Sequence, residues 1–157
     1  MEYISKRLTI LIKMNCYSGQ TILITGHTGF KGSWLSVWLN SLGARVVGLS
    51  NNVPTKTSNF EASKIGEIVE DHRVDIRDSV AVKNLVKSCQ PDFVFHLAAQ
   101  ALVRPSYENP VDTISTNALG TSHVLDALRT LNKRVVAVMI TSDKAYDNLE
   151  WVWGYKE

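Results

Sequence analysis

Three polar residues, Ser142, Asp143 and Lys144, follow directly after the apolar run VVAVMIT at 135–141. Such a run is typical of a buried strand, and side chains at the carboxyl end of a strand in an open α/β sheet face the crevice where ligands bind. A hydroxyl, a carboxylate and an amine in a row are hard to explain as packing, although a helix cap made by Ser142 or Asp143 is the alternative. We therefore take these three as candidate catalytic residues.

A glycine-rich turn, TGHTGFKG, begins at Thr25 and places Gly26, Gly29 and Gly32 three residues apart. Glycines allow main-chain N–H groups and the positive end of a following helix to approach an anionic group closely. The pyrophosphate of a dinucleotide suits such a turn. Because a glycine pattern alone is weak evidence, a turn that only packs a helix on a strand is the alternative.

The segments on both sides of this turn predict a strand and a helix. Thr21–Thr25 is short and rich in β-branched residues, as buried parallel strands are. From residue 30 onwards the apolar side chains fall on one helical face, which we expect to pack on the sheet: Phe30, Trp34, Val37, Trp38 and Leu42. Gly43 then supplies a left-handed end to the helix.

Strand and helix patterns alternate along the rest of the chain. Strands are predicted at 45–50, 72–75, 93–97 and 135–141, and helices at 60–69, 79–89 and 111–131, with 105–110 as a loop. This alternation predicts an α/β fold, a Rossmann-type doubly wound parallel sheet with strand order 3-2-1-4-5 that is incomplete at its carboxyl end. We divide the chain into a leader or extension, 1–20, and a dinucleotide-binding domain, 21–157.

Polar residues at two predicted strand ends are candidates for contacts with an adenosine. Ser50, Asn51 and Asn52 stand where an acidic residue would bind the ribose, and their neutral side chains leave the choice between NAD and NADP open. Asp75, with the Ile76 backbone beside it, is a candidate acceptor for the adenine amino group, and pairing with Arg77 is the alternative. Asp78 is predicted to cap the helix at 79–89.

Small and polar residues near the fourth strand complete the candidate list. Ala98 and Ala99 would leave room for a ribose against the backbone, whereas His96 is interpreted as a hydrogen-bonded core histidine. In the helix at 111–131, Asn117 lies among apolar positions that we expect to face inwards, Ile114, Ala118, Leu125 and Leu128. Asn117 is either a bridge to neighbouring backbone or part of a proton relay.

Length and composition exclude several classes of protein. With 157 residues, 45% of them hydrophobic, and a net charge of +2, the chain suits one domain and lacks the basic run of a nucleic-acid-binding protein. Cys16 and Cys89 have no metal-ligand spacing with the histidines, which predicts no metal site and a reducing cytoplasm. The apolar run at 8–12 is too short for a membrane span.

The motifs TGHTGFKGSWL, HLAAQALVRPSY, TNALGTSHVLDALR, TSDKAYDN and WVWGY together resemble the CDP-glucose 4,6-dehydratases, within the extended short-chain dehydrogenase/reductases. The resemblance implies an enzyme that binds NAD and converts CDP-glucose to CDP-4-keto-6-deoxyglucose, as a homo-oligomer in its full-length form. A nucleotide-sugar epimerase, a dehydratase for another nucleotide and an inactive dinucleotide-binding protein are the alternatives. The cofactor contacts that it implies come from Gly26, Thr28, Gly29, Phe30, Gly32, Asp75, Ile76, Leu97, Ala98, Ala99, Asn117 and Thr141.

The same resemblance implies a role for each candidate catalytic residue. Ser142 matches a residue that hydrogen-bonds the oxygen being oxidised, and Asp143 matches the acid that protonates the departing hydroxyl. Lys144 stands where many related dehydratases carry a glutamate base. The Tyr-x-x-x-Lys pair of the family does not occur up to Glu157, so we expect the chain to be an amino-terminal piece that is inactive alone.

Overall fold

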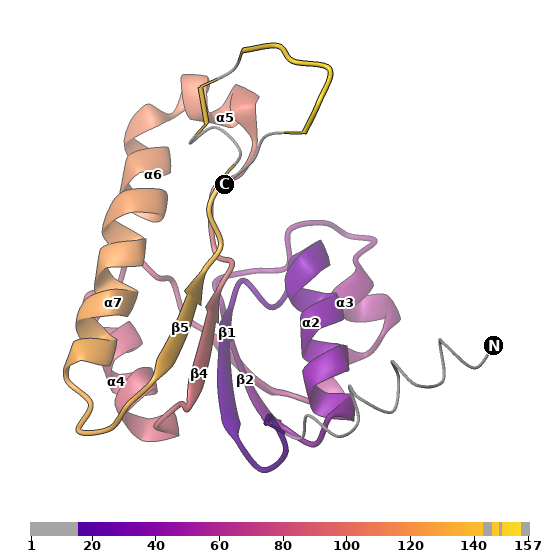
Figure 1. The fold of residues 1–157 in the computed structure, drawn as a ribbon, viewed down its shortest axis with the longest axis vertical. Coiled ribbons are helices and arrows are strands. Elements are labelled where there is room, and N and C mark those ends of the chain that lie inside the picture. Colours follow the sequence, from indigo (N-terminus) through magenta and orange to yellow (C-terminus); the bar gives the residue numbers. More distant parts are fainter. Residues whose placement is uncertain (1–15, 143–145, 148, 155–157) are drawn as a thin grey trace.

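The computed structural model describes residues 16–142, 146–147 and 149–154, which form a three-layer α/β/α arrangement (Figure 1). Five parallel strands make one sheet in the order β3-β2-β1-β4-β5, which confirms the predicted fold class and strand order. The elements are β1 Thr21–Thr25, α2 Phe30–Ser41, β2 Arg45–Ser50, α3 Asn59–Ala62, η1 Ile65–Glu67, β3 Glu70–Arg73, α4 Ser79–Cys89, β4 Phe93–His96, α5 Val103–Glu108, α6 Pro110–Ile114, η2 Ser115–Gly120, α7 Thr121–Arg129 and β5 Val136–Met139.

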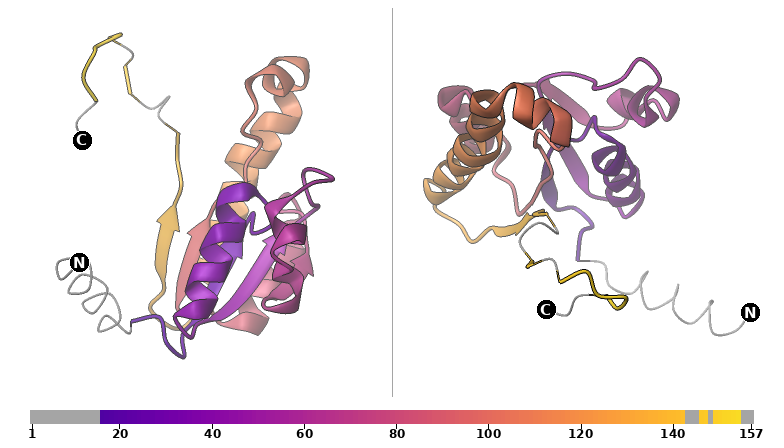
Figure 2. Two further views of the ribbon diagram at one scale, coloured as in Figure 1. Left: turned by 90° about the vertical axis from the view of Figure 1, so that its right-hand side faces the viewer. Right: turned by 90° about the horizontal axis from the view of Figure 1, so that it is seen from above.

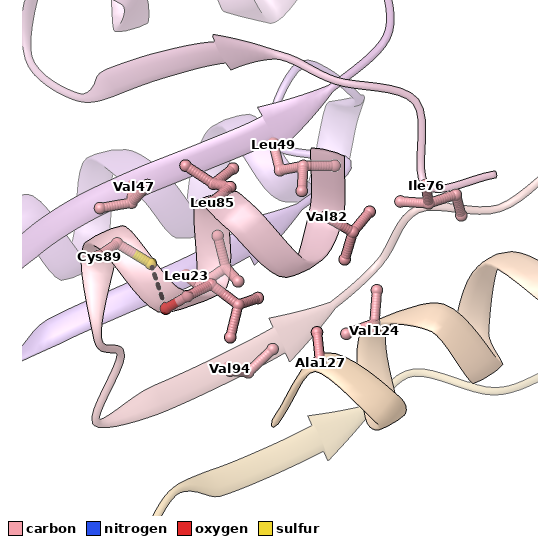
Figure 3. Close-up of a cluster of buried hydrophobic side chains, with 11 residues drawn as sticks. Leu23, Val47, Leu49, Ile76, Val82, Leu85, Cys89, Val94, Val124 and Ala127 are labelled. Carbon is pink, nitrogen blue, oxygen red and sulfur yellow. Dashed lines mark hydrogen bonds between the residues drawn. The ribbon is translucent and has the colours of Figure 1, made fainter. Parts of the chain in front are cut away.

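The helices cover the two faces of the sheet unequally (Figure 2). On one face, α4 and α7 enclose the main hydrophobic core, in which Leu23, Val47 and Val94 from three neighbouring strands are completely buried (Figure 3). On the other face, α2 covers β1 and β2, where Leu39 meets Ile22, Ile24 and Val46. Beyond α2, this second face carries Phe93 and Phe95 of β4. The Tyr17 ring packs against both, with its centroid 5.1 Å from that of Phe93 and 6.5 Å from that of Phe95.

The predicted packing face of α2 is wrong. Phe30, Trp34 and Trp38 are exposed, and the residues that α2 buries are Gly32, Ser33, Ser36 and Leu39. The physical reason is close approach: a Cβ on Gly32 would lie 2.2 Å from the Gly26 oxygen, so the helix meets the turn through small residues. Ser33 and Ser36 satisfy their hydroxyls by donating to the backbone oxygens of His27 and Gly32.

The segment between β4 and β5 also differs from the prediction. The expected loop at 105–110 is mostly helix α5, in whose first turn Pro105 is tolerated because that turn needs no N–H donor there. The single helix expected at 111–131 is α6, the π-helical η2 and α7, which ends at Arg129. Because α7 packs into the main core through Val124 and Ala127, the predicted positions Ile114, Ala118 and Leu125 are exposed.

Smaller corrections concern boundaries and burial. The third strand is β3, two residues earlier than the predicted 72–75, and the helix predicted at 60–69 is divided into α3 and η1. The strand predicted at 135–141 is the shorter β5 at the edge of the sheet, where Val136 and Val138 are exposed rather than buried. Within the described residues no helix combines the length and apolar character needed to cross a membrane.

Candidate functional site

A cavity of about 290 Å³ opens at the carboxyl ends of β1, β2 and β4. The strand order reverses at β1, since β2 lies on one side of it and β4 on the other, and open α/β sheets bind ligands at such switch points. Seventeen residues line the cavity: Gly26, Thr28, Gly29, Ser50, Asn51, Asn52, Pro54, Val74, Asp75, Ile76, Arg77, Leu97, Ala98, Ala99, Gln100, Asp112 and Thr116.

The three glycine positions of the turn differ in how strictly they require glycine. Gly26 has a φ of +74°, and a Cβ there would lie 2.8 Å from the Ala98 nitrogen, so this position requires glycine for both its backbone angle and its contact with β4. Gly32 is required by its contact with the Gly26 oxygen. Gly29 is less restricted, because its added Cβ would meet only that oxygen, at 3.3 Å. Of the three, Gly29 is the one whose replacement least disturbs packing while still changing the cavity wall.

The helix that starts at this turn presents its positive end to the cavity. Gly29 caps α2, and the first N–H groups of an α-helix have no acceptor within the helix. These donors and the macrodipole favour a negative group at the cavity wall next to Gly29. Gly26 and Gly29, which carry no side chains, and the first N–H groups of α2 fit a pyrophosphate, and the volume beside Ala98 and Ala99 fits the attached ribose and adenine.

The acidic side of the cavity is organised by Arg77. Its guanidinium lies 2.6 Å from the Asp75 carboxylate and also pairs with Asp112 of α6. The hydrogen bond from the Arg77 side chain lowers the pKa of Asp75, with burial acting in the opposite direction. The predicted alternative for Asp75, pairing with Arg77, is therefore observed, and an adenine contact from the same cavity wall stays a prediction. Asp78 caps α4 as predicted by accepting from the Val80 and Ala81 nitrogens.

Asn117 forms a structural bridge. Its side chain accepts from the Gln100 nitrogen at 2.8 Å and donates to the Gln100 oxygen at 2.9 Å. These two bonds hold the strand-to-helix connection after β4 against η2, and they account for both ends of the amide. Of the two interpretations of Asn117, the bridge is the one whose hydrogen bonds are present, although Asn117 itself does not line the cavity.

His96 is a core histidine, as predicted. It is 4% exposed, and its ring nitrogens lie 2.7 Å from the Thr25 hydroxyl and 2.9 Å from the Thr121 hydroxyl. Thr25 also accepts from the nitrogens of Leu97 and Ala98, so the ring, β1 and the cavity wall form one network. Burial lowers the pKa of His96.

The candidate catalytic corner is described only in part. Thr141 and Ser142 follow the carboxyl end of β5, just as the glycine turn follows the carboxyl end of β1. Asp143 and Lys144 lie outside the described residues. Phe30, Gly32 and Thr141 do not line the cavity, although Gly32 supports its turn. No group of three or more histidine, cysteine or acidic side chains in the described ranges is arranged to hold a metal ion.

Several residues of the cavity were not among the predicted cofactor contacts. Arg77, Asp112 and Thr116 come together only because η2 and α6 lie over the end of β3, which no local pattern indicates. Gly120 of η2 was also missed: a Cβ there would lie 2.6 Å from the Ile76 side chain. His123 of α7 bonds the Ile76 oxygen at 3.0 Å, so η2 and α7 together fix the cavity wall at Ile76.

Comparisons with known proteins identify relatives of this chain. The chain is 48% identical over 147 residues to the CDP-glucose 4,6-dehydratase of Salmonella typhimurium, covering 94% of this chain and 41% of that protein. It is 36% identical over 117 residues to a GDP-mannose 4,6-dehydratase of Yersinia enterocolitica, covering 68% of this chain and 30% of the relative. The chain thus spans less than half the length of these curated relatives.

Solved structures show the same fold. The epimerase Mth375 of Methanothermobacter thermautotrophicus superposes with a TM-score of 0.73 and 29% identity over 90% of this chain and 41% of that chain. A UDP-glucose-4-epimerase of Stenotrophomonas maltophila, solved with bound NAD, gives 0.71 and 27% over 85% of this chain and 40% of its own. The family model described as GDP-mannose 4,6 dehydratase matches residues 23–152, and the predicted resemblance is confirmed: the chain belongs to this family of nucleotide-sugar dehydratases and epimerases.

Proposed function

We propose that this chain is the NAD-binding portion of a nucleotide-sugar dehydratase that converts CDP-glucose to CDP-4-keto-6-deoxyglucose. The observation that carries the proposal is the cavity at the carboxyl ends of β1, β2 and β4, whose glycine turn and helix end suit a pyrophosphate. The similarity to the Salmonella typhimurium enzyme supports CDP-glucose as the substrate. We further propose that the enzyme acts in the cytoplasm.

The residues of the cavity fit NAD in a defined order. Gly26, Thr28 and Gly29 would surround the pyrophosphate, Ala98 and Ala99 would lie against a ribose, and Asp75 with the Ile76 backbone would meet the adenine. Bound NAD would supply a hydride acceptor that later returns the hydride to the sugar. The other contributions to the reaction come from side chains of the protein.

The proposed catalytic roles belong to the residues that follow β5. Ser142 would donate a hydrogen bond to the oxygen on the fourth carbon of the sugar, Asp143 would protonate the hydroxyl that leaves the sixth carbon, and Lys144 would take the proton from the fifth carbon. An amine accepts a proton at neutral pH only when its pKa is lowered, which burial beside a positive charge achieves. Of the three, only Ser142 belongs to the described residues.

Dinucleotide binding is tested with Gly29→Val. The added side chain projects into the cavity wall, and we expect NAD affinity to fall at least tenfold, about 1.4 kcal/mol, while the sheet remains folded. Isothermal titration calorimetry measures the affinity, and far-UV circular dichroism reports the fold. Trp34→Val, at an exposed position of the same helix, is the matched control. Unchanged affinity in Gly29→Val would mean that the glycines serve packing alone.

A test of the reaction and of its substrate needs a protein that contains the complete catalytic domain. The longer protein that this proposal implies, with its own carboxyl-terminal part, would be assayed with CDP-, UDP-, GDP- and dTDP-glucose. Preferred formation of a 4-keto-6-deoxy sugar from CDP-glucose supports the proposal. Faster turnover of another nucleotide sugar contradicts the substrate, and an epimerised product without loss of water favours the epimerase that the fold comparison also allows.

A further inference from the structure

A row of hydrogen-bonded polar side chains connects β3 to the cavity. The His27 ring lies between two partners, with Nε2 2.9 Å from Asp71 Oδ1 and Nδ1 3.1 Å from Ser50 Oγ. His27 is completely buried, whereas Ser50 is 5% exposed and lines the cavity. The row therefore runs from a carboxylate on β3, through a ring in the glycine turn, to a hydroxyl at the cavity wall.

The position of the His27 ring is fixed by its neighbours. A Cβ on Gly48 would lie 2.3 Å from a carbon of the ring, so the glycine in the middle of β2 leaves the space that the ring fills. The Phe60 ring meets it edge to face at 5.5 Å between centroids. The ring is consequently held in one orientation, with one nitrogen directed at Asp71 and the other at Ser50.

These partners determine where the hydrogens lie. A carboxylate only accepts, so His27 Nε2 carries the hydrogen and donates it to Asp71. Burial lowers the pKa of His27 more strongly than Asp71 raises it, and Arg73 acts in the same direction as burial. A neutral ring has one N–H, so Nδ1 accepts, and the Ser50 hydroxyl donates its hydrogen to Nδ1.

The Ser50 oxygen is then left to act as an acceptor. The Thr28 N–H points towards it at 3.5 Å. Because Ser50 lines the cavity, its remaining lone pair could accept a hydrogen bond from a ligand there. The positive charges of Arg73 and Arg77 are balanced by ion pairs, because Arg73 pairs with Asp71 at 2.6 Å and Arg77 pairs with Asp75 and Asp112. Both guanidinium groups are therefore already paired with carboxylates.

We infer that Ser50, with its hydrogen held by His27 and Asp71, presents an acceptor to the 2′-hydroxyl of the adenosine ribose and thereby selects NAD over NADP. The inference rests on the proposed binding of a nicotinamide dinucleotide. A hydroxyl donates to this acceptor, whereas a 2′-phosphate at neutral pH offers mainly acceptors and negative charge, and would face a lone pair. Ser50 is at the end of β2, where dinucleotide folds usually place a carboxylate for the same hydroxyl.

The variant Asp71→Asn tests the hydrogen arrangement without touching the cavity, which Asp71 does not line. Arg73 Nη2 lies 2.6 Å from Asp71 Oδ2 and only donates, so the new amide turns its oxygen to Arg73 and its NH₂ to His27. His27 must then carry its hydrogen on Nδ1 and donate to Ser50, whose own hydrogen becomes free to point into the cavity. We expect the ratio of NAD to NADP affinity to fall about tenfold.

Calorimetry with NAD, NADP and 2′-deoxy-NAD on the full chain separates this effect from others. Ser50→Ala should weaken NAD binding about five- to tenfold and leave 2′-deoxy-NAD binding unchanged. In the Ser50→Ala background, Asp71→Asn should shift the NAD to NADP ratio no further. Glu70→Gln is the matched control, because Glu70 is a carboxylate of the same strand that pairs with Arg45 and does not line the cavity.

Three results overturn the inference. One is an unshifted ratio in Asp71→Asn, and another is an equal shift when Ser50 is already alanine, which would assign the effect to the released charge of Arg73. A third is weaker binding of 2′-deoxy-NAD in Ser50→Ala, which would show a general loss of the site. If the unaltered chain binds neither dinucleotide, the proposed function fails as well, whereas NAD binding with an unshifted ratio overturns this inference alone.

Discussion

The two faces of the sheet differ in how far they are covered. Beneath α4 and α7, strands β2, β1 and β4 contribute side chains that are completely buried, including Val47, Leu23 and Val94. On the opposite face, α2 covers β1 and β2, but Val136 and Val138 of β5 remain 45% and 39% exposed. The covered regions meet at β1, and the exposed region lies at the β5 edge of the sheet.

This difference separates the proposed cofactor cavity from the candidate catalytic corner. Ile76 belongs both to the buried cluster under α4 and α7 and to the cavity wall, and Ala98 packs against the same cluster. The cavity is therefore held by the well-packed part of the domain. Ser142, by contrast, follows β5, where the described residues provide no helix over the second face.

The largest difference in unfolding free energy is expected between two valine-to-alanine substitutions on the neighbouring strands β4 and β5. Val94→Ala removes a completely buried side chain of β4, and we expect a loss of about 2–3 kcal/mol of unfolding free energy from lost burial and a residual cavity. Val138→Ala, on β5, should cost less than about 1 kcal/mol because that side chain is already 39% exposed. Urea denaturation measures both, and equal losses would show that β5 is covered in solution.

A smaller loss of unfolding free energy is expected at Asp92, whose hydrogen bonds connect β1 to the segment before β5. Asp92 accepts from the Thr21 nitrogen of β1 at 2.8 Å and from Lys133, just before β5, at 2.6 Å. Asp92→Asn keeps one acceptor and loses the charge, so we expect about 1–2 kcal/mol of destabilisation at pH 7.

The pH dependence of the same variant gives an independent check. The hydrogen bond from Lys133, followed by that from Thr21, lowers the pKa of Asp92 below its ordinary value of 3.8. The unfolded state therefore binds the proton first on acidification, so the contribution of Asp92 is fully present above about pH 4–5 and is lost as the pH falls through the folded pKa. Stability curves of the two proteins should converge as the pH falls through the lowered pKa of Asp92, and a difference that persists at the acid end would contradict this account.

The smallest effect on stability is expected from charges on the exposed face. Val136→Lys combined with Val138→Lys should change the unfolding free energy by less than about 1 kcal/mol, because both positions are partly open to water. We expect the unaltered chain to self-associate, since an exposed, apolar edge strand recruits other chains. Size-exclusion chromatography should show the lysine variant as the smaller species. A monomer before and after the substitution would remove the link between this edge and association.

The sequence predicted the sheet more accurately than it predicted the helices. Short β-branched runs and the glycine turn were sufficient for the strands and their order, because right-handed crossovers leave few alternatives. For α2, however, apolar periodicity indicated the wrong face, since contact with the turn required Gly32 and Ser36 to be inside and left Trp34 and Trp38 exposed. Periodicity reports where apolar residues lie, and close backbone approach can outweigh it.

The site was predictable where it depended on local chemistry and not where it depended on distant contacts. Gly26, Gly29, Asp75 and Ala98 were recognised from their places after strands, and all four line the cavity. The contact of His27 with Asp71 joins residues 44 positions apart, so no short motif contains it. A histidine in the glycine turn and a glycine inside β2 were its only local signals.

The π-helical turn η2 has a consequence for insertions and deletions. A π-turn contains one residue more than the α-helix would need, so deletion of Ala118 would let α6, η2 and α7 become one regular helix. Because the wider turn already absorbs the additional residue, the helical parts on either side of the deletion would keep nearly the same phase, and Asp112 would remain at the cavity. A deletion within α6 or α7, where no wider turn absorbs it, would instead rotate the preceding part by about 100° and turn Asp112 away from the cavity. The tolerance of this helical segment for a change of length is therefore confined to η2.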